Sequence, residues 1–196
     1  MRKVIVSEFL TLDGVMQAPG DPDEDRSGGF EAGGWQLAYF DDVFGKAVMD
    51  TFDKIDGFLF GRRTYEIMAA YWPTATEPEP LAGMMNRLAK HVVSTTLEEP
   101  LAWENSRLVG DDVPTAIAEL KGRPGKDLAV LGSGRLVQTL MMHVLVDEYR
   151  LMIHPLVLGS GRRLFGEGSP PSRLRLVDSA TSGTGILILT YRPEKG

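Results

Sequence analysis

Residues 127–140, DLAVLGSGRLVQTL, predict a strand, a glycine turn and a helix in direct succession. The apolar run 128–131 is typical of a buried strand, and apolar residues then recur at helical spacing. The turn and the apolar helix positions are Gly132, Ser133, Gly134, Leu136, Val137, Leu140 and Met141. Glycine leaves the backbone open, and a helix N-terminus carries partial positive charge. The segment therefore suits a phosphate or nucleotide ligand, and a tight turn without a ligand is the alternative.

The same four letters, GSGR, return at residues 159–162 in a different context. This copy follows the apolar run 153–158, but no long apolar-periodic segment comes after it. Without a helix behind it, the turn has no helix N-terminus to offer an anion. We therefore expect a structural turn there.

Composition limits the classes of function. The chain has 196 residues, of which 43% are hydrophobic, and we expect a single domain over residues 1–196. A net charge of −6 argues against nucleic acid as a general partner. Cysteine is absent, and His91, His143 and His154 lie far apart, so we expect no disulfide and no metal site. No signal-like segment and no apolar run of ~20 residues is visible, which favours a cytoplasmic protein without a membrane span.

The periodicity along the chain predicts strands that alternate with helices and then strands alone. Strands are expected over 3–9, 57–60, 91–94, 107–109, 128–131, 149–158, 173–180 and 186–192. Helices are expected over 42–54, 61–72, 81–90, 114–121 and after Gly134, and residues 17–34 form a long loop with an acidic stretch. This order favours an α/β sheet that ends in an antiparallel hairpin.

Three of the predicted loops follow strands, at 13–14, 61–64 and 132–135. Ligands of such sheets bind beyond the carboxyl ends of the strands. The second loop, in FLFGRRTYE at 58–66, adds Arg62 and Arg63 at a helix start, where guanidinium groups can grip a phosphate. Thr64 can cap this helix or donate to a phosphate. A surface arginine pair is the alternative, although the helix dipole disfavours cations there.

Several segments together resemble a known family. They are SEFLTLDG at 7–14, GRRTYE at 61–66, STT at 94–96, GSGR at 132–135 and EYRLMIHPLVLGSGRRLF at 148–165. In order and spacing they resemble the dihydrofolate reductase fold, and within it the RibD C-terminal domain of riboflavin-biosynthesis reductases. The resemblance covers essentially the whole chain. It implies a three-layer α/β/α domain with a mixed, mostly parallel sheet and a C-terminal antiparallel hairpin.

The resemblance also implies a reduced nicotinamide cofactor, NADPH, along the carboxyl edge of the sheet. The residues that it places at the cofactor are Asp13, Gly14, Gly61, Arg62, Arg63, Thr64, Ser94, Thr95, Gly132, Ser133, Gly134, Arg135 and Leu136. An arginine with Ser94 and Thr95 would hold the 2′-phosphate, and the 132–135 turn would hold the pyrophosphate. The 17–34 loop is similar to the mobile active-site loop of these enzymes, and the late strands would form a homodimer.

The chemistry implied is hydride transfer to a C=N or C=O bond of a small molecule, with a proton delivered beside it. Asp41 and Asp42 lie near the place of the first-helix carboxylate of dihydrofolate reductases, with Asp42 preferred, and helix capping is their competing role. Trp35 and Tyr39 could form an aromatic wall for a flat substrate, or ordinary core.

Four functions remain open at this point. The first is an NADPH-dependent reductase similar to 5-amino-6-(5-phosphoribosylamino)uracil reductase, although no further basic cluster for a substrate phosphate is evident. A chain without cysteine cannot carry the zinc deaminase often fused to that enzyme, which indicates a stand-alone reductase-like domain. The alternatives are a non-catalytic dimeric nucleotide-binding module, a true dihydrofolate reductase, and a flavin- or deazaflavin-linked oxidoreductase.

Overall fold

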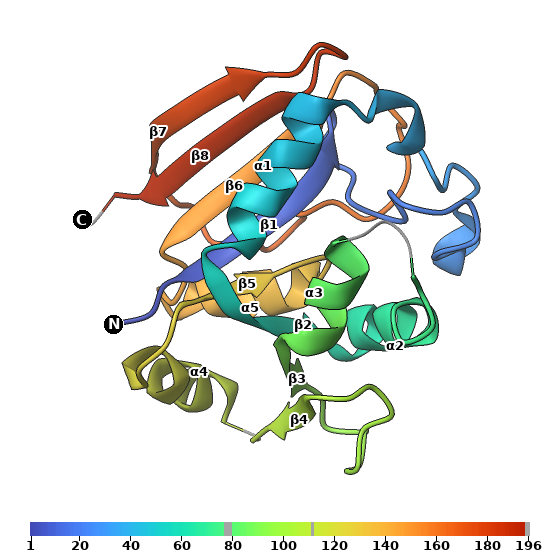
Figure 1. The fold of residues 1–196 in the computed structure, drawn as a ribbon. Helices are drawn as coiled ribbons and strands as arrows, with labels where there is room; N and C mark the ends of the chain where they lie inside the picture. The colour runs from blue at the N-terminus through green and yellow to red at the C-terminus, as the bar shows by residue number, and fades with distance from the viewer. Residues whose placement is uncertain (77–79, 111, 195–196) are drawn as a thin grey trace.

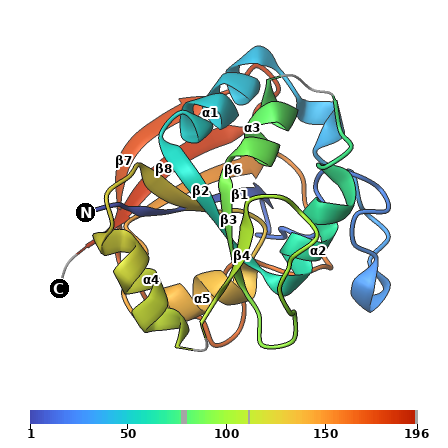
Figure 2. The same cartoon turned by 60° about the horizontal axis from the view of Figure 1, so that its bottom comes forward.

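The computed structural model describes residues 1–76, 80–110 and 112–194, which form one eight-stranded sheet with helices on both faces (Figures 1 and 2). The strands are β1 (Val4–Thr11), β2 (Ile55–Gly61), β3 (Ala89–Val93), β4 (Ser106–Val109), β5 (Asp127–Val130), β6 (Glu148–His154), β7 (Leu174–Thr181) and β8 (Leu187–Pro193). The helices are α1 (Asp42–Phe52), α2 (Arg62–Tyr71), α3 (Leu81–Arg87), α4 (Val113–Gly122) and α5 (Gly134–Met142), with short 3-10 turns η1 (Ser27–Gly29) and η2 (Leu37–Tyr39). None of these helices is long and apolar enough to cross a bilayer, within the described ranges.

The strand order is β4-β3-β2-β5-β1-β6-β8-β7. The pairs from β4 to β6 are parallel, whereas β8 pairs with β6 and β7 in the antiparallel sense. The α/β fold with a C-terminal hairpin is confirmed. Because β5 inserts between β1 and β2, the loops after these three strands emerge side by side at one edge.

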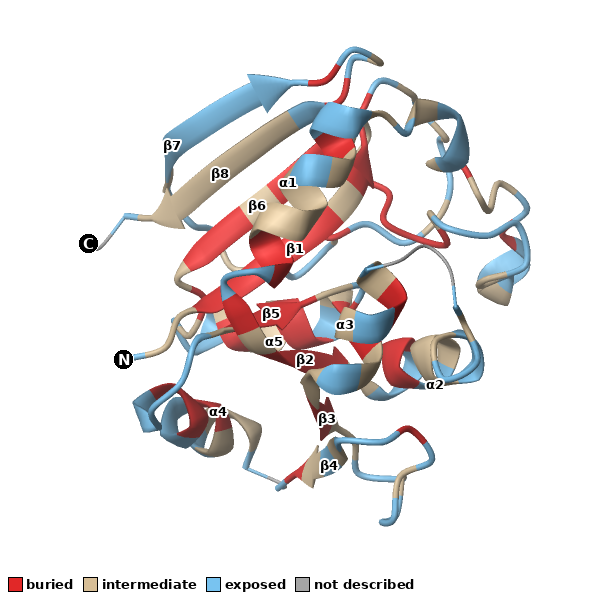
Figure 3. Ribbon diagram, viewed as in Figure 1, coloured by how far each residue is buried: buried red, intermediate tan, exposed pale blue. Residues whose placement is uncertain are grey.

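The central strands are buried because helices cover both of their faces (Figure 3). Residues alternate along a strand, so β1 contributes to two cores. One face of the sheet packs against α4 and α5 through Val4, Val6, Leu59, Leu128, Val130, Ile117, Leu120, Leu136, Val137 and Leu140. The opposite face packs against α1, α2 and α3 through Ile5, Phe52, Phe58, Phe60, Tyr65, Met85 and Ala129.

The boundaries of several elements differ from the sequence prediction. The strand expected over 149–158 ends at His154, because Pro155 has no N–H for the ladder. The helix expected over 42–54 ends at Phe52, and the strand expected over 128–131 ends one residue early. The loop 17–34 is more ordered than expected, since it contains η1 and buries Phe30 against Val15.

Substitution of Phe58 tests how much the core under α1, α2 and α3 contributes to the stability of the fold. Its ring is completely buried and lies 5.3 Å from Phe60 and 5.5 Å from Phe52 between centroids. We expect Phe58→Ala to lower the free energy of unfolding by about 3–5 kcal/mol, since it removes packed apolar surface and leaves a cavity. Phe40, which is 65% exposed, is the matched control, and Phe40→Ala should cost less than about 1 kcal/mol. Urea unfolding of both variants measures the difference, and equal losses would contradict this account.

Candidate functional site

The turns that follow β2 and β5 are joined by hydrogen bonds. The Gly61 N–H donates to Ser133 Oγ at 3.0 Å, and Thr64 Oγ1 donates to the Gly132 carbonyl at 2.8 Å. Thr64 and Ser133 are only 7% and 5% exposed. The structure thus brings two of the predicted loops into direct contact. Gly61, Thr64 and Ser133 hold these two turns together. Their contact with a cofactor stays a prediction.

The glycines of the 132–134 turn are required by close packing. Gly132 has φ +62°, and a Cβ there would lie 3.0 Å from Thr64 Cγ2. A Cβ on Gly134 would lie 2.9 Å from Met16 Sδ. The surface of the turn is nevertheless open, because Gly132 and Arg135 are exposed. The predicted phosphate turn is therefore both tightly built and accessible.

Helix α5 begins at this turn as predicted. The Val137 N–H bonds to the Ser133 carbonyl, so the N–H groups of Gly134, Arg135 and Leu136 belong to the first helical turn and have no intrahelical acceptor. The partial positive charge of these groups suits an anion. The Leu136 side chain is buried in the core between α5 and the sheet.

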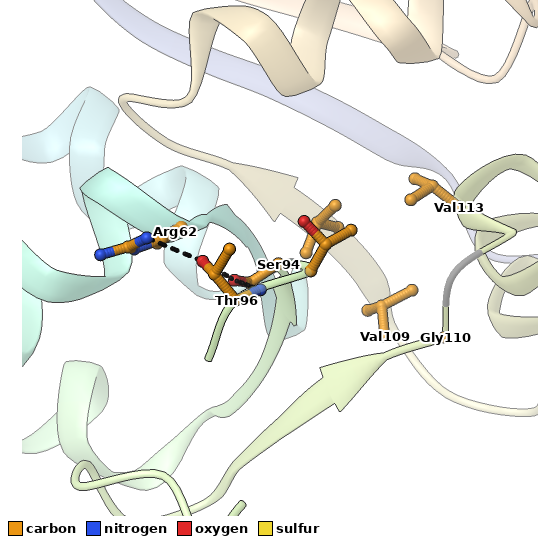
Figure 4. Close-up of a pocket in the computed structure, with 8 residues that line it drawn as sticks. Arg62, Ser94, Thr96, Val109, Gly110 and Val113 are labelled. Carbon is orange, nitrogen blue, oxygen red and sulfur yellow. Dashed lines mark hydrogen bonds between the residues drawn. The ribbon is translucent and has the colours of Figure 1, made fainter. Parts of the chain in front are cut away.

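Arg62 borders a cavity of about 270 Å³ at the ends of β3 and β4 (Figure 4). The cavity is lined by Arg62, Val93, Ser94, Thr95, Thr96, Val109, Gly110 and Val113. Arg62 donates to Thr96 Oγ1 at 2.7 Å and to Glu66 Oε1 at 2.8 Å. Ser94 Oγ accepts the N–H groups of Thr96 and Leu97. The structure therefore places Arg62, Ser94, Thr95 and Thr96 around one cavity, and their contact with a 2′-phosphate stays a prediction.

Arg63 lies in different surroundings from Arg62. Its guanidinium donates hydrogen bonds to Ser27 Oγ and, at 3.4 Å, to Asp25 Oδ1. Arg162, from the second GSGR segment, also pairs with Asp25 and bonds to Ser27. Burial alone would raise the pKa of Asp25, but the hydrogen bonds of Ser27 and the two guanidinium charges lower it. We call this group, formed by Asp25, Ser27, Arg63 and Arg162, the loop latch, because it fastens the 17–34 loop.

Asp13 holds the second GSGR segment. Its carboxylate accepts from Thr11 Oγ1 at 2.6 Å and from the N–H groups of Leu158 and Gly159 at 3.2 and 2.9 Å. The Thr11 hydroxyl is the largest of the causes that lower the pKa of Asp13 to about 2. Gly14 follows with φ +80°, and a Cβ added there would meet no atom within 4 Å. Asp13 therefore anchors a structural turn, and its proximity to a nicotinamide stays a prediction.

The two candidate acids differ in their contacts. Asp41 is the N-cap of α1: Oδ1 accepts the Phe44 N–H at 2.8 Å and Oδ2 accepts the Thr184 N–H at 3.1 Å. The Phe44 N–H is the main cause of the lowered pKa of Asp41. Such a carboxyl is a weak proton donor at neutral pH. Asp42 is exposed in the first turn of α1, and the catalytic role of either residue stays a prediction.

Trp35 and Tyr39 lie edge-on to the ring of His154, at 5.0 and 5.7 Å between centroids. Trp35 is 8% exposed and donates Nε1–H to the Gln17 carbonyl at 2.8 Å. His154 is completely buried, and its Nδ1 meets two backbone carbonyls while Nε2 has no partner. Burial lowers the pKa of His154 and so favours the neutral ring, although the Met152 and Leu10 carbonyls oppose the shift. Trp35 and Tyr39 thus pack around a buried histidine, as core residues do, and their contact with a substrate stays a prediction.

Glu8 is a residue that the sequence analysis missed. It lies on the core face of β1 between Val6 and Leu10 and is 4% exposed. Oε2 accepts the Gly132 N–H at 2.9 Å, and Oε1 has no partner. Burial raises the pKa of Glu8 to about 8, although the N–H groups of Gly132 and Ser133 oppose the shift. A lone glutamate at an inward position of an apolar strand was the sequence signal for it.

The edge offers two features that suit a ligand with separate anionic groups. One is the Arg62 cavity with its hydroxyl groups, and the other is the exposed first turn of α5. They lie at the ends of β3 and β5, with only β2 between these strands. Across the ranges that the structure describes, no cluster of three or more histidines or carboxylates could hold a metal ion.

Comparisons with known proteins agree with this fold. The family model described as the RibD C-terminal domain matches residues 2–188. The protein YyaP of Bacillus subtilis is 29% identical over 194 residues, which covers 97% of this chain and 94% of YyaP. YwjB of the same organism is 24% identical and covers 94% of this chain and 95% of its own.

Solved structures show the same fold. A putative riboflavin biosynthesis protein from Shewanella sp. PV-4 has a TM-score of 0.70 and 21% identity, with 98% of this chain and 99% of that chain covered. A Thermotoga maritima diaminohydroxyphosphoribosylaminopyrimidine deaminase/5-amino-6-(5-phosphoribosylamino)uracil reductase has a TM-score of 0.65 and 15% identity, with 98% of this chain and 56% of that chain covered. At these identities the likeness establishes the fold alone.

The buried carboxyl of Glu8 predicts a pH-dependent stability. Its pKa rises from 4.5 to about 8 on folding, so the native state keeps a proton that the unfolded chain loses in this window. The contribution of Glu8 is complete below about pH 4.5 and is lost as the pH rises through about 8. We expect the free energy of unfolding of Glu8→Gln to rise relative to that of the wild type by about 1 kcal/mol for each pH unit in that window. Urea unfolding at a series of pH values measures this gain, and a constant difference between the two proteins would contradict it.

Proposed function

Because the chain belongs to the RibD C-terminal domain family, we propose that it is an NADPH-dependent reductase of a small heterocyclic or carbonyl compound. The family is reductase-related, which supports an oxidoreductase in general. The observation that carries the proposal is the Arg62 cavity beside the accessible turn before α5. Together they supply cationic, hydroxyl and N–H donors along one sheet edge, where α/β sheets bind their ligands.

In this proposal two groups of residues hold the cofactor. Arg62, with Ser94 and Thr95, binds the 2′-phosphate through charge-assisted hydrogen bonds. The first-turn N–H groups of Gly134 and Arg135 bind the pyrophosphate. The bound cofactor supplies a hydride for an electron-poor carbon, and the protein supplies orientation and exclusion of water.

A proton must also reach the substrate. We assign this role to Asp42 rather than Asp41, because both oxygens of Asp41 already accept hydrogen bonds from backbone N–H groups. Asp42 is exposed in the same helical turn. A catalytic part for Asp42 would therefore leave the cap of α1 intact.

The substrate class follows from the family and from the remaining charges. A phosphoribosylaminopyrimidine, as in the name of the Thermotoga maritima relative, would need cations for its phosphate. Arg63 and Arg162 of the loop latch could serve it, although Asp25 partly neutralises them. A pyrimidine or pterin without a phosphate needs no such cations. We therefore keep the small heterocycle as the proposed class.

A second candidate function is a nucleotide-binding module without catalysis. The lowered pKa of Asp41 and the enclosure of His154 favour it, because neither group can donate a proton to a ligand as it stands. Measurements of NADPH oxidation and NADPH binding distinguish the two functions. Loss of the reduced-nicotinamide absorbance with a panel of pyrimidines, pterins and carbonyl compounds supports the reductase. Tight NADPH binding without turnover on the whole panel supports the module.

We also propose a homodimer formed through the C-terminal hairpin. β7 is the last strand of the sheet and exposes Leu176 and Val177, at 48% and 38%. An exposed apolar edge strand tends to pair with another strand. A second copy of β7 would cover this edge.

Arg62 and Arg63 form a matched pair for testing the cofactor assignment, since their side chains are 52% and 58% exposed. We expect Arg62→Ala to weaken NADPH binding by about 10- to 100-fold and to leave NADH binding nearly unchanged, because only NADPH carries the 2′-phosphate. Arg63→Ala should affect both dinucleotides alike. Calorimetric titration of each variant measures these affinities. Equal losses of NADPH and NADH in Arg62→Ala would refute the 2′-phosphate assignment.

The dimer has its own test. Leu176→Glu should convert a dimer to a monomer in sedimentation velocity, because it places a charge on the apolar edge. Val144→Glu, at a residue that is 83% exposed after α5, is the control and should leave the dimer intact. A wild-type protein that sediments as a monomer at all concentrations would exclude the proposed dimer.

A further inference from the structure

Glu8 is a buried carboxyl that no cation neutralises in the described residues. It lies directly beneath the 132–134 turn, where one of its oxygens takes the Gly132 N–H and the other has no hydrogen-bond partner. A buried polar atom without a partner is costly, and a buried charge is more so. This arrangement therefore requires an explanation beyond the stability of the fold.

Glu148 shows how the same chain handles a structural buried glutamate. It is 3% exposed and lies on the adjacent strand β6. Arg150 and Arg192 donate to its two oxygens at 3.2 and 3.0 Å, and Lys3 lies 3.7 Å away. These cations keep Glu148 ionised, and its pKa is lowered although burial opposes this. Glu8 lacks every one of these partners.

Few ionisable groups surround Glu8. On its own face, β1 presents Val6 and Leu10, and β6 presents Tyr149, whose pKa burial raises to about 12. Helix α5 contributes Arg135, which is exposed at the surface of the turn. The Arg163 carbonyl approaches Gly134, while the Arg163 guanidinium turns to Asp13. Burial and backbone N–H groups thus govern the titration of Glu8.

The charge state of Glu8 bears on any anion at this turn. An ionised Glu8 places a negative charge in a poorly screened position behind the turn, where it repels an anion held by the first-turn N–H groups of α5. A protonated Glu8 carries no such charge and still accepts the Gly132 N–H through its carbonyl oxygen. Phosphate binding and protonation of this carboxyl therefore favour one another.

We propose that Glu8 is a positioning residue that couples binding of a dinucleotide pyrophosphate at the 132–134 turn to uptake of one proton. This inference rests on the proposed function, because it needs the dinucleotide to occupy that turn. By linkage, a ligand that prefers the protonated protein weakens as the pH rises above the pKa of the free protein.

The experiment measures NADPH affinity by calorimetry from about pH 7.5 to 9.5, where the 2′-phosphate, with a second pKa of about 6, stays ionised. Buffers of different ionisation enthalpy also report proton uptake. We expect wild-type affinity to fall by up to about tenfold for each pH unit above pH 8, with about one proton taken up for each NADPH bound. Glu8→Gln, which mimics the neutral acid, should bind with the same affinity across the range and take up no proton. Glu148→Gln is the matched control and should keep the wild-type profile.

The outcomes separate the two proposals. A flat profile in the wild type, or an unchanged slope in Glu8→Gln, overturns the coupling and leaves the proposed function standing. Absence of NADPH binding at every pH overturns both. Lys90, whose pKa burial lowers to about 8, titrates in the same range but lies over Trp103 on the opposite face of the sheet. Its effect would persist in Glu8→Gln, so the variant distinguishes the two groups.

Discussion

The hydrogen bonds between the turns after β2 and β5 are the contacts on which the candidate site depends. Gly61 and Ser133, and Thr64 and Gly132, join two turns that are 72 and 68 residues apart in the chain. They fix the starts of α2 and α5 relative to each other, and so fix Arg62 relative to the α5 N-terminus. A site held by such contacts is organised before any ligand arrives, which reduces the ordering cost of binding.

The sequence predicted the elements whose pattern is local. The apolar run, the glycines and the helical spacing of residues 127–140 all lie within one segment, so β5 and α5 could be identified there. The α/β fold followed from the order of such segments and from the family resemblance. Strand ends were less predictable, because ladder partners such as those of β6 come from distant parts of the chain.

The site was predicted less completely than the fold. Arg62 and Arg63 are indistinguishable in the sequence, and only the fold shows that one meets Thr96 while the other meets Ser27. Glu8 was missed because its significance depends on Gly132, which lies 124 residues further along the chain. Glu8 and His154, two of the groups with a buried side-chain atom that lacks a hydrogen-bond partner, lie on opposite faces of β1 and β6. Such unsatisfied groups are expected where function, rather than stability, selects the residue.

The loop latch has a consequence for how ionic strength acts on the protein. Asp25 joins the 17–34 loop to Arg63 and Arg162, whose side chains are 58% and 47% exposed, so dissolved ions reach these pairs. Salt weakens exposed ion pairs, so added electrolyte loosens the attachment of the 17–34 loop to Arg63 and Arg162. The apolar packing of Phe30 against Val15 does not depend on charge and keeps its hold on the same loop.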